Sequence, residues 1–294
     1  MKLFISSILP LLASSLPASL ISRLQSAVGV GETDFGSFNT CDLGDLDNDC
    51  QLDTLPVDTS TLINPSEEFG TSCIDGGNYH FQVFPSPHLT DTDMKNDVLI
   101  YFQGGGACWD KLSYDMSLCS KTAGAQATTG LFCRNGSCNS KETNPYEDYT
   151  IIHVTYCSGD AHVGQTDRPE WSKRHNVTQR GAPNAQSAIR YITSQRVLME
   201  QGVGKLAIMG CSAGSLGSQA WADEVLYEMD DIGFESSVVI PDSYAGVFPE
   251  GSESVTIKDF GACDTILLAE EPELQEKCRN EQVSGLSSET VSHY

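Results

Sequence analysis

A short apolar stretch that leads into a serine flanked by glycines constrains the fold of this chain more than any other feature. Residues 206–209 have the composition of a buried strand, Gly210-Cys-Ser212-Ala-Gly214 follows at once, and a helix-compatible run comes next. A serine at a tight strand-to-helix turn has strained backbone angles, so small residues are needed on both sides of it. This context is typical of a nucleophile elbow and predicts Ser212 as a nucleophile. The alternative is a turn with an incidental serine.

The elbow belongs to a longer alternation of strand-like and helix-like segments that begins at about residue 72. Such alternation predicts an α/β domain with a mostly parallel sheet and flanking helices, and we place that domain at residues 67–280. One helix is expected over residues 184–201, with Gly202 as its stop signal, and a second from about residue 213. The expected strands are residues 79–84, 98–102, 151–156, 206–209 and 238–240.

A run of three glycines follows the expected strand at residues 98–102. Acyl transfer from a serine needs hydrogen-bond donors for the developing oxyanion, each worth roughly 3–4 kcal/mol. The sequence Gln-Gly104-Gly105-Gly106 resembles the glycine-rich loop that supplies such donors in lipases and esterases. We therefore predict an oxyanion hole made by the backbone N–H groups of Gly105, Gly106 and Ala213. A bulge or sharp turn is the alternative for the glycines alone.

The N-terminal residues are typical of a secreted protein. A single lysine precedes an apolar run that Pro10 and Pro17 interrupt, which is too short for a membrane span. We predict a signal peptide over residues 1–20, extending to about 27, and no membrane anchor. An acidic, flexible lead-in is expected over residues 28–66. Residues 45–53 space carboxylates like the start of a calcium loop, but Cys50 replaces its turn glycine, so a solvated acidic segment is the better interpretation.

Eleven cysteines and two sequons also favour export to an oxidising compartment. The predicted glycosylation sites are Asn135 and Asn176. The odd cysteine count leaves at least one thiol unpaired, and Cys211 beside the elbow is one candidate among the eleven. The spacings Cys41/Cys50 and Cys133/Cys138 fit disulfides better than zinc, so no metal site is predicted, and no cofactor. Residues 112–145 are expected to form a disulfide-pinned insertion over one end of the sheet.

The charge balance limits the partners of the protein. With 17 basic and 40 acidic residues the formal net charge is −23, which disfavours nucleic acid and anionic membrane surfaces. A heavily charged polyuronate would also be repelled. A neutral, esterified or acetylated substrate therefore fits better.

Five ordered motifs carry a resemblance to a known family. The chain resembles the pectin acetylesterase and Notum carboxylesterase family over about residues 70 to 280. The matching segments are Gly104-Gly-Gly-Ala-Cys-Trp109, Tyr156-Cys-Ser-Gly-Asp160 with Val163-Gly164, Arg180-Gly181 with Asn184, Gly210–Gly214, and Asp242-Ser243 with Gly246 and Phe248. The resemblance implies an α/β-hydrolase fold and a Ser-His-Asp esterase that acts on an acylated polysaccharide or an acylated protein.

In that family the catalytic aspartate and histidine lie further toward the C-terminus, on turns after two later strands. We therefore expect this chain to be C-terminally incomplete, with a sheet that is incomplete at that edge and a polar tail at residues 281–294. The strand at residues 238–240 would be central in a complete sheet but is expected to lie at an edge here, and such an exposed edge is prone to association. This form should therefore be less stable or less soluble than an extended one.

The histidines and the candidate acid fit that interpretation. His80 and His153 lie in expected strands and are expected to be core or near-core residues. The others that precede the elbow stand where the order Ser, acid, His of this fold does not place the base: His88, His162 and His175. Only His293 follows Ser212; it is a weak candidate base and is otherwise expected to be exposed. Asp242 is a candidate acid or supporting residue, but without a histidine it completes no triad.

Two functions follow from these observations. The first is a secreted carboxylic-ester hydrolase in which Ser212 attacks the acyl carbon. The second is a secreted binding protein built on an inactive hydrolase scaffold. A gene that continues in frame past Tyr294 into an Asp-bearing and then a His-bearing turn would favour the enzyme, whereas a genuine stop would favour the scaffold.

Overall fold

A computed structural model describes residues 38–91, 93–126, 130–134, 144–243, 253–269 and 271–282 of the 294-residue chain. Several predictions concern residues outside these ranges. They are the signal peptide, the glycosylation site Asn135, the pairing of Cys133 with Cys138, the motif residues Gly246 and Phe248, the candidate base His293, and the polar tail beyond residue 282.

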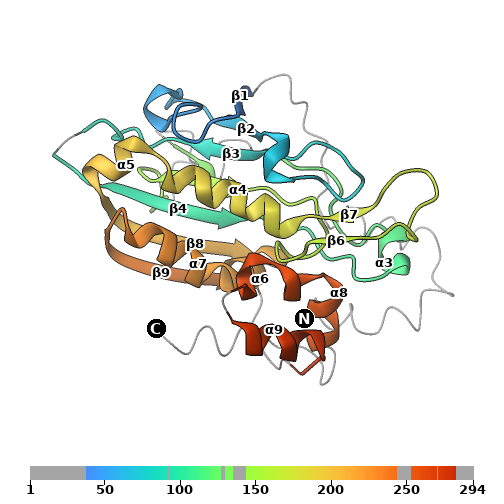
Figure 1. The fold of residues 1–294 in the computed structure, drawn as a ribbon. Helices are drawn as coiled ribbons and strands as arrows, with labels where there is room; N and C mark the ends of the chain where they lie inside the picture. The colour runs from blue at the N-terminus through green and yellow to red at the C-terminus, as the bar shows by residue number, and fades with distance from the viewer. Residues whose placement is uncertain are drawn as a thin grey trace. The chain divides into compact units, whose positions relative to one another are not determined.

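Seven strands form one mixed sheet in the order β1-β2-β3-β5-β4-β8-β9 (Figure 1). Only β3 runs antiparallel to its neighbours, and the other pairs are parallel. The mostly parallel sheet with flanking helices is therefore confirmed, and each of the five predicted strands is present. The strands are β1 (Asn39–Leu43), β2 (Thr61–Pro65), β3 (Phe81–Phe84), β4 (Asn96–Phe102), β5 (Thr150–Val154), β8 (Val203–Cys211) and β9 (Phe234–Asp242).

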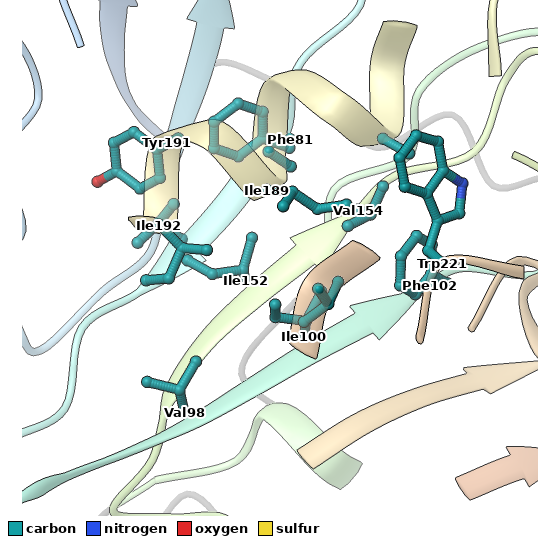
Figure 2. Close-up of a cluster of buried hydrophobic side chains, with 14 of the residues drawn as sticks. Phe81, Val98, Ile100, Phe102, Ile152, Val154, Ile189, Tyr191, Ile192 and Trp221 are labelled. Carbon is teal, nitrogen blue, oxygen red and sulfur yellow. The ribbon is translucent and has the colours of Figure 1, made fainter. Parts of the chain in front are cut away.

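The main hydrophobic core lies between one face of this sheet and the helices α4 (Gly181–Thr193) and α7 (Ala222–Asp230) (Figure 1). Strand side chains alternate between the two faces, so every second residue of β4 points into this core. Figure 2 shows these residues meeting the α4 side chains and an indole ring. The labelled members of the cluster are Phe81, Val98, Ile100, Phe102, Ile152, Val154, Ile189, Tyr191, Ile192 and Trp221.

The opposite face of the sheet packs against part of the insertion predicted over residues 112–145. There the short 3-10 helix η4 (Gly130–Phe132) brings Phe132 onto the sheet, with its ring centroid 5.0 Å from that of Phe84. Leu99 and Ile151 are fully buried in the same cluster. The helix α3 (Lys111–Asp115) begins the insertion.

The crossover helix predicted over residues 184–201 is two helices, α4 and α5 (Arg196–Gln201). Gln195 separates them with an extended backbone, at ψ 116°. Its side-chain Oε1 accepts the N–H of Leu52, and its Nε2 donates to the carbonyl of Tyr191. The interruption therefore arises because this buried glutamine pairs with a segment far away in the sequence. The second predicted helix is similarly divided, into α6 (Ala213–Ala220) and α7, around Trp221.

The prediction of a flexible lead-in over residues 28–66 is wrong for residues 38–66. These residues supply β1, the 3-10 helix η2 (Leu52–Thr54) and β2, and Leu52 and Ile63 are fully buried. The disulfide Cys41–Cys50 closes the acidic turn between β1 and η2. Within that turn the Asp49 carboxylate accepts the N–H groups of Gly44 and Asp45. Composition was misleading here because a few buried contacts to distant residues order an otherwise polar segment.

Replacing Leu52 with alanine tests whether this segment is part of the folded core. Leu52 is fully buried, so we expect the substitution to lower the free energy of unfolding by about 2–5 kcal/mol, measured by urea denaturation. Val57 in the same segment is 40% exposed, and its replacement by alanine is the matched control, expected to cost less than about 1 kcal/mol. Equal urea midpoints for the wild type and Leu52→Ala would show that the segment is not part of the folded core.

Four disulfides join described cysteines: Cys41–Cys50, Cys73–Cys157, Cys108–Cys119 and Cys263–Cys278. Cys133 is also disulfide-bonded. Cys211 is the free thiol among the described cysteines, which confirms the candidate drawn from its place beside the elbow.

The disulfide Cys263–Cys278 staples a small helical unit made of α8 (Glu253–Asp259) and α9 (Pro272–Arg279), with the 3-10 helices η5 (Ala262–Asp264) and η6 (Ile266–Leu268) between them. A second hydrophobic cluster attaches this unit to the start of α6, with Phe260 and Val163 buried and Ala213 and Leu216 partly buried. In the described ranges we find no helix of the length and hydrophobicity that a membrane crossing requires.

Candidate active site

The elbow predicted from the sequence is present at the carboxyl end of β8. Ser212 has φ 59° and ψ −120°, lies between β8 and α6, and is exposed. Glycines are required on both sides because the backbone approaches itself closely. A Cβ on Gly210 would lie 1.9 Å from the Gly214 carbonyl oxygen, and one on Gly214 would lie 2.0 Å from that of Phe102. The positive φ of a non-glycine residue is a strained conformation that occurs preferentially at functional sites.

The glycine run after β4 lies directly against this turn. β4 and β8 are neighbouring parallel strands, and the last residue pair in their register is Phe102 with Gly210. A Cβ on Gly104 would be 2.3 Å from the Cys211 carbonyl oxygen and 3.1 Å from the Ser212 Cβ. The loop therefore follows the elbow backbone at a distance that only glycine permits.

Residues of the insertion hold the glycine loop, which we define as Gly104–Gly106, from behind. The Ser120 N–H donates to the Gly105 carbonyl at 2.8 Å, and Gly106 adopts φ 76° where it bridges to Cys119. Cys119 is itself disulfide-bonded to Cys108 two residues after the loop. The N–H groups of Gly105, Gly106 and Ala213 donate to no acceptor among the described residues.

Asp242 supports the turn through its backbone. Its carbonyl oxygen accepts the Ser212 N–H at 3.0 Å, while its carboxylate accepts the Ser243 hydroxyl at 2.9 Å. The Cys211 Sγ lies 3.8 Å from the same hydroxyl. In the described part of the chain, no histidine is hydrogen-bonded to the Asp242 carboxylate or to Ser212.

The histidines that precede the elbow lie in or beside the sheet, near the surface, or beside the glycine loop. His153 is fully buried and burial lowers its pKa to about 3, and burial also lowers the pKa of His80 to about 4. His88 and His175 lie near the surface, 3.4 Å from Asp148 and 3.3 Å from Asp75 respectively. His162 is buried beside the glycine loop, a position that its place in the sequence did not indicate.

Asp160, which belongs to one of the five sequence motifs, is a buried carboxylate for which the sequence indicated no role. It accepts hydrogen bonds from the Ser158 hydroxyl at 2.6 Å, the Gly181 N–H at 2.8 Å and the His162 N–H at 3.2 Å. Burial raises its pKa to about 6 despite these bonds. It caps the first turn of α4, where Gly181 gives it room: a Cβ there would lie 2.1 Å from the Asp160 Oδ1. Its contact with Gly181 spans 21 positions in the sequence, so no local pattern indicates its role.

These shifts predict that the protein loses stability as the pH falls from about 6.5 to about 4. His80, His153 and His162 have folded-state pKa values of about 4, 3 and 4, below the ordinary 6.5, so in this window the unfolded chain binds more protons. Asp160, with a pKa raised from 3.8 to about 6, acts in the opposite direction, but it is one group against three.

Melting temperatures between pH 7 and 4.5 test this pH dependence. The melting temperature of the non-titrating His153→Gln variant should fall less steeply on acidification than that of the wild type. The reason is that this variant lacks one of the three histidines that destabilise the folded state at low pH. A melting temperature that rises on acidification would contradict the assignment.

The described residues contain no group of three or more His, Cys, Asp or Glu side chains placed to hold a metal ion. The positions that the site brings together are therefore the exposed Ser212 hydroxyl, the glycine loop with its backbone N–H groups, and the first turn of α6. All of them follow the carboxyl ends of the neighbouring strands β4 and β8.

A sheet with this strand order, one reversed strand and a serine elbow after the strand next to the glycine loop defines an α/β-hydrolase fold. The family model described as Pectinacetylesterase matches residues 53–281, and the chain belongs to this family. The sequence resemblance is thereby confirmed.

Among solved structures, that of the Wnt deacylase Notum from Drosophila is similar, with 16% sequence identity and a TM-score of 0.47. The match covers 70% of this chain and 62% of that chain, so this chain spans less than two thirds of the length of that structure. A search among curated proteins finds no match.

Proposed function

We propose that the protein is a secreted carboxylic-ester hydrolase whose nucleophile is Ser212. The observation that carries the proposal is the meeting of two features at one point. An exposed serine with positive φ stands at the end of β8, and a glycine loop lies so close to it that a Cβ on Gly104 would contact the elbow backbone. Family membership supports an ester as the substrate.

In the proposed reaction, the Ser212 Oγ attacks the acyl carbonyl carbon and forms a C–O bond while its proton passes to a general base. The negative charge that develops on the carbonyl oxygen is stabilised by the N–H groups of Gly105, Gly106 and Ala213. The intermediate then expels the alcohol, which takes the proton from the same base, and leaves an acyl-serine. Water attacks this acyl group in the same way, releasing the carboxylic acid and restoring Ser212. We assign the base to no described residue, and His293 stays a candidate.

The substrate class follows from charge and compartment. The net charge of −23 favours a neutral ester, such as an acetylated polysaccharide, or an acylated protein, over a naked polyanion. Four disulfides among described residues support secretion. Asn176 is exposed just before the short strand β7 (Thr178–Gln179), where an attached glycan would project into solvent.

The substrate proposal is tested by acid release from two substrates with the whole gene product. We expect acetate from acetylated pectin whose carboxylates are methyl-esterified, a neutral glycan ester, and compare it with fatty-acid release from an O-acylated peptide. Hydrolysis of the peptide alone would move the substrate to acylated proteins. Absence of hydrolysis on both, in a folded protein that also fails to react with a serine-directed probe, would favour the inactive scaffold instead.

A further inference from the structure

His162, a buried histidine that takes no part in the reaction above, lies between the glycine loop and α6. Its side chain is 1% exposed, and its Nε2 lies 2.8 Å from the Gln103 carbonyl oxygen. The ring packs edge-on against Phe102 and lies tilted on Tyr156, with centroids 5.3 and 4.7 Å away.

The hydrogen bond to Gln103 fixes the protonation of the ring. A carbonyl oxygen only accepts, so the His162 Nε2 carries a hydrogen and donates it. The backbone of the histidine is anchored on both sides, because its N–H donates to the Asp160 carboxylate at 3.2 Å and its carbonyl accepts the Trp221 Nε1–H at 2.8 Å. It also adopts φ 67°, an uncommon conformation for a histidine, which these anchors maintain.

The accepting carbonyl belongs to the peptide group that begins the glycine loop. Because a peptide group is planar, fixing the Gln103 carbonyl fixes the direction of the Gly104 N–H and the plane from which Gly105 and Gly106 continue. Gln103 is held further by its N–H, which donates to Val154 at 3.0 Å, and by its Oε1, which accepts the Tyr156 N–H at 2.9 Å.

The other side of the imidazole contacts the helix that follows the nucleophile. A Cβ on Gly217 of α6 would lie 2.9 Å from the His162 Cδ2 and 3.1 Å from its Cβ, so the absence of a side chain there makes room for the ring. One side chain therefore contacts both the peptide group that leads into the glycine loop and the helix that begins with Ala213, and these two parts supply the proposed oxyanion donors.

We propose that His162 is a positioning residue that sets the glycine loop against the elbow by donating its Nε2–H to the Gln103 carbonyl. The inference rests on the proposed function, because positioning has an effect only if the loop stabilises an oxyanion. We assign the ring no general-base role, because its Nε2 holds its hydrogen on a carbonyl oxygen and its Nδ1 makes no hydrogen bond to Ser212 in the part of the chain that the structure describes. Burial lowers its pKa to about 4, so the ring stays neutral in assays near neutral pH.

The test compares His162→Leu with His162→Gln in the whole gene product. Leucine fills similar space without a donor, whereas the glutamine amide can place an N–H where the imidazole Nε2–H was. We expect His162→Leu to lower kcat for an aryl acetate, and the rate of Ser212 labelling by a fluorophosphonate, by about 10- to 100-fold, with KM changed little. His162→Gln should recover activity to within about threefold of the wild type, a split that a merely structural role would not produce.

His153 offers a matched control, because it is equally buried but packs against Phe132 on the sheet face away from α4. His153→Leu should change the melting temperature while the labelling rate of the folded protein stays at the wild-type value. If the wild type and His162→Leu are both labelled, and at the same rate, the positioning role alone is overturned. Equal losses in both His162 variants would also overturn it. A folded wild type without labelling would overturn the proposed function and this inference together.

If His162→Leu fails to fold, Gly217→Ala provides the second variant. Alanine favours the helix but pushes on the ring from the opposite side, so we expect slower labelling without loss of the cooperative unfolding transition. Labelling of Gly217→Ala at the wild-type rate would overturn the proposal.

Discussion

Replacing Ser212 with alanine is expected to lower kcat for ester hydrolysis by about 10⁴-fold or more, the effect of removing a serine nucleophile from its catalytic unit. Ser212 is exposed and has a backbone φ of 59°, and its hydroxyl oxygen is the only atom of the described site that we assign to attack on the acyl carbon. The alanine retains the backbone hydrogen bond to the Asp242 carbonyl, so the fold should be unchanged. Initial rates on an aryl acetate, with melting temperatures in parallel, measure both effects.

Ser237→Ala is the matched control for this experiment. Ser237 is an exposed serine on β9, the strand next to the elbow strand, and its replacement should leave the rate at the wild-type value. If Ser212→Ala keeps more than about a tenth of the wild-type kcat, the hydrolysis does not depend on this serine, because a true nucleophile contributes far more.

Gly104→Ala is expected to produce the second large effect, a loss of about 10²- to 10³-fold in kcat, comparable to the loss of an oxyanion donor. The new Cβ would lie 2.3 Å from the Cys211 carbonyl oxygen, a backbone atom, so the glycine loop or the elbow must move. Kinetics on the aryl acetate give kcat and KM, and thermal unfolding shows whether the variant is folded.

Gly124→Ala controls for the addition of a methyl group close to the same site. Its Cβ would meet the Gln103 Nε2 at 3.5 Å, an ordinary contact, so we expect wild-type kinetics and stability. A folded Gly104→Ala variant with wild-type kcat would contradict the assignment of the loop to oxyanion stabilisation.

The elbow and the central strands could be predicted from the sequence because their signals are local. The apolar run of β8, the small residues around Ser212 and the helix after it all lie within about twenty consecutive residues. The same holds for β4 and its glycines. Because the glycine run precedes the serine turn in the chain order expected for such a site, the two could be predicted to lie side by side.

The features that could not be predicted depend on contacts between distant segments. Residues 38–66 have a polar composition, yet Leu52 is buried, and its N–H is bonded to Gln195, which lies 143 positions away. The break between α4 and α5 has the same cause. His162 reaches the glycine loop through a turn with positive φ at a non-glycine residue, which no periodicity of the sequence indicates.

The acid and base of the proposed mechanism belong to a different category. Asp242 was predicted as a candidate acid or supporting residue; it is the last residue of β9, and the structure brings its backbone carbonyl, rather than its carboxylate, to Ser212. His293 lies outside the described residues. The proposed nucleophile and the proposed oxyanion loop are therefore supported by geometry, whereas the proton-transfer residues are required by the chemistry of the proposed reaction.

The most direct measurement of the central claim is labelling of the folded, whole gene product with a fluorophosphonate, followed by peptide mass spectrometry. The Ser212 Oγ displaces fluoride from phosphorus, and the phosphoryl oxygen occupies the oxyanion hole, so the reaction requires both halves of the proposed site. We predict one adduct, on the peptide that contains Ser212, which is absent from Ser212→Ala and from heat-unfolded protein. No adduct in the folded protein, or an adduct on a different serine, would contradict the account.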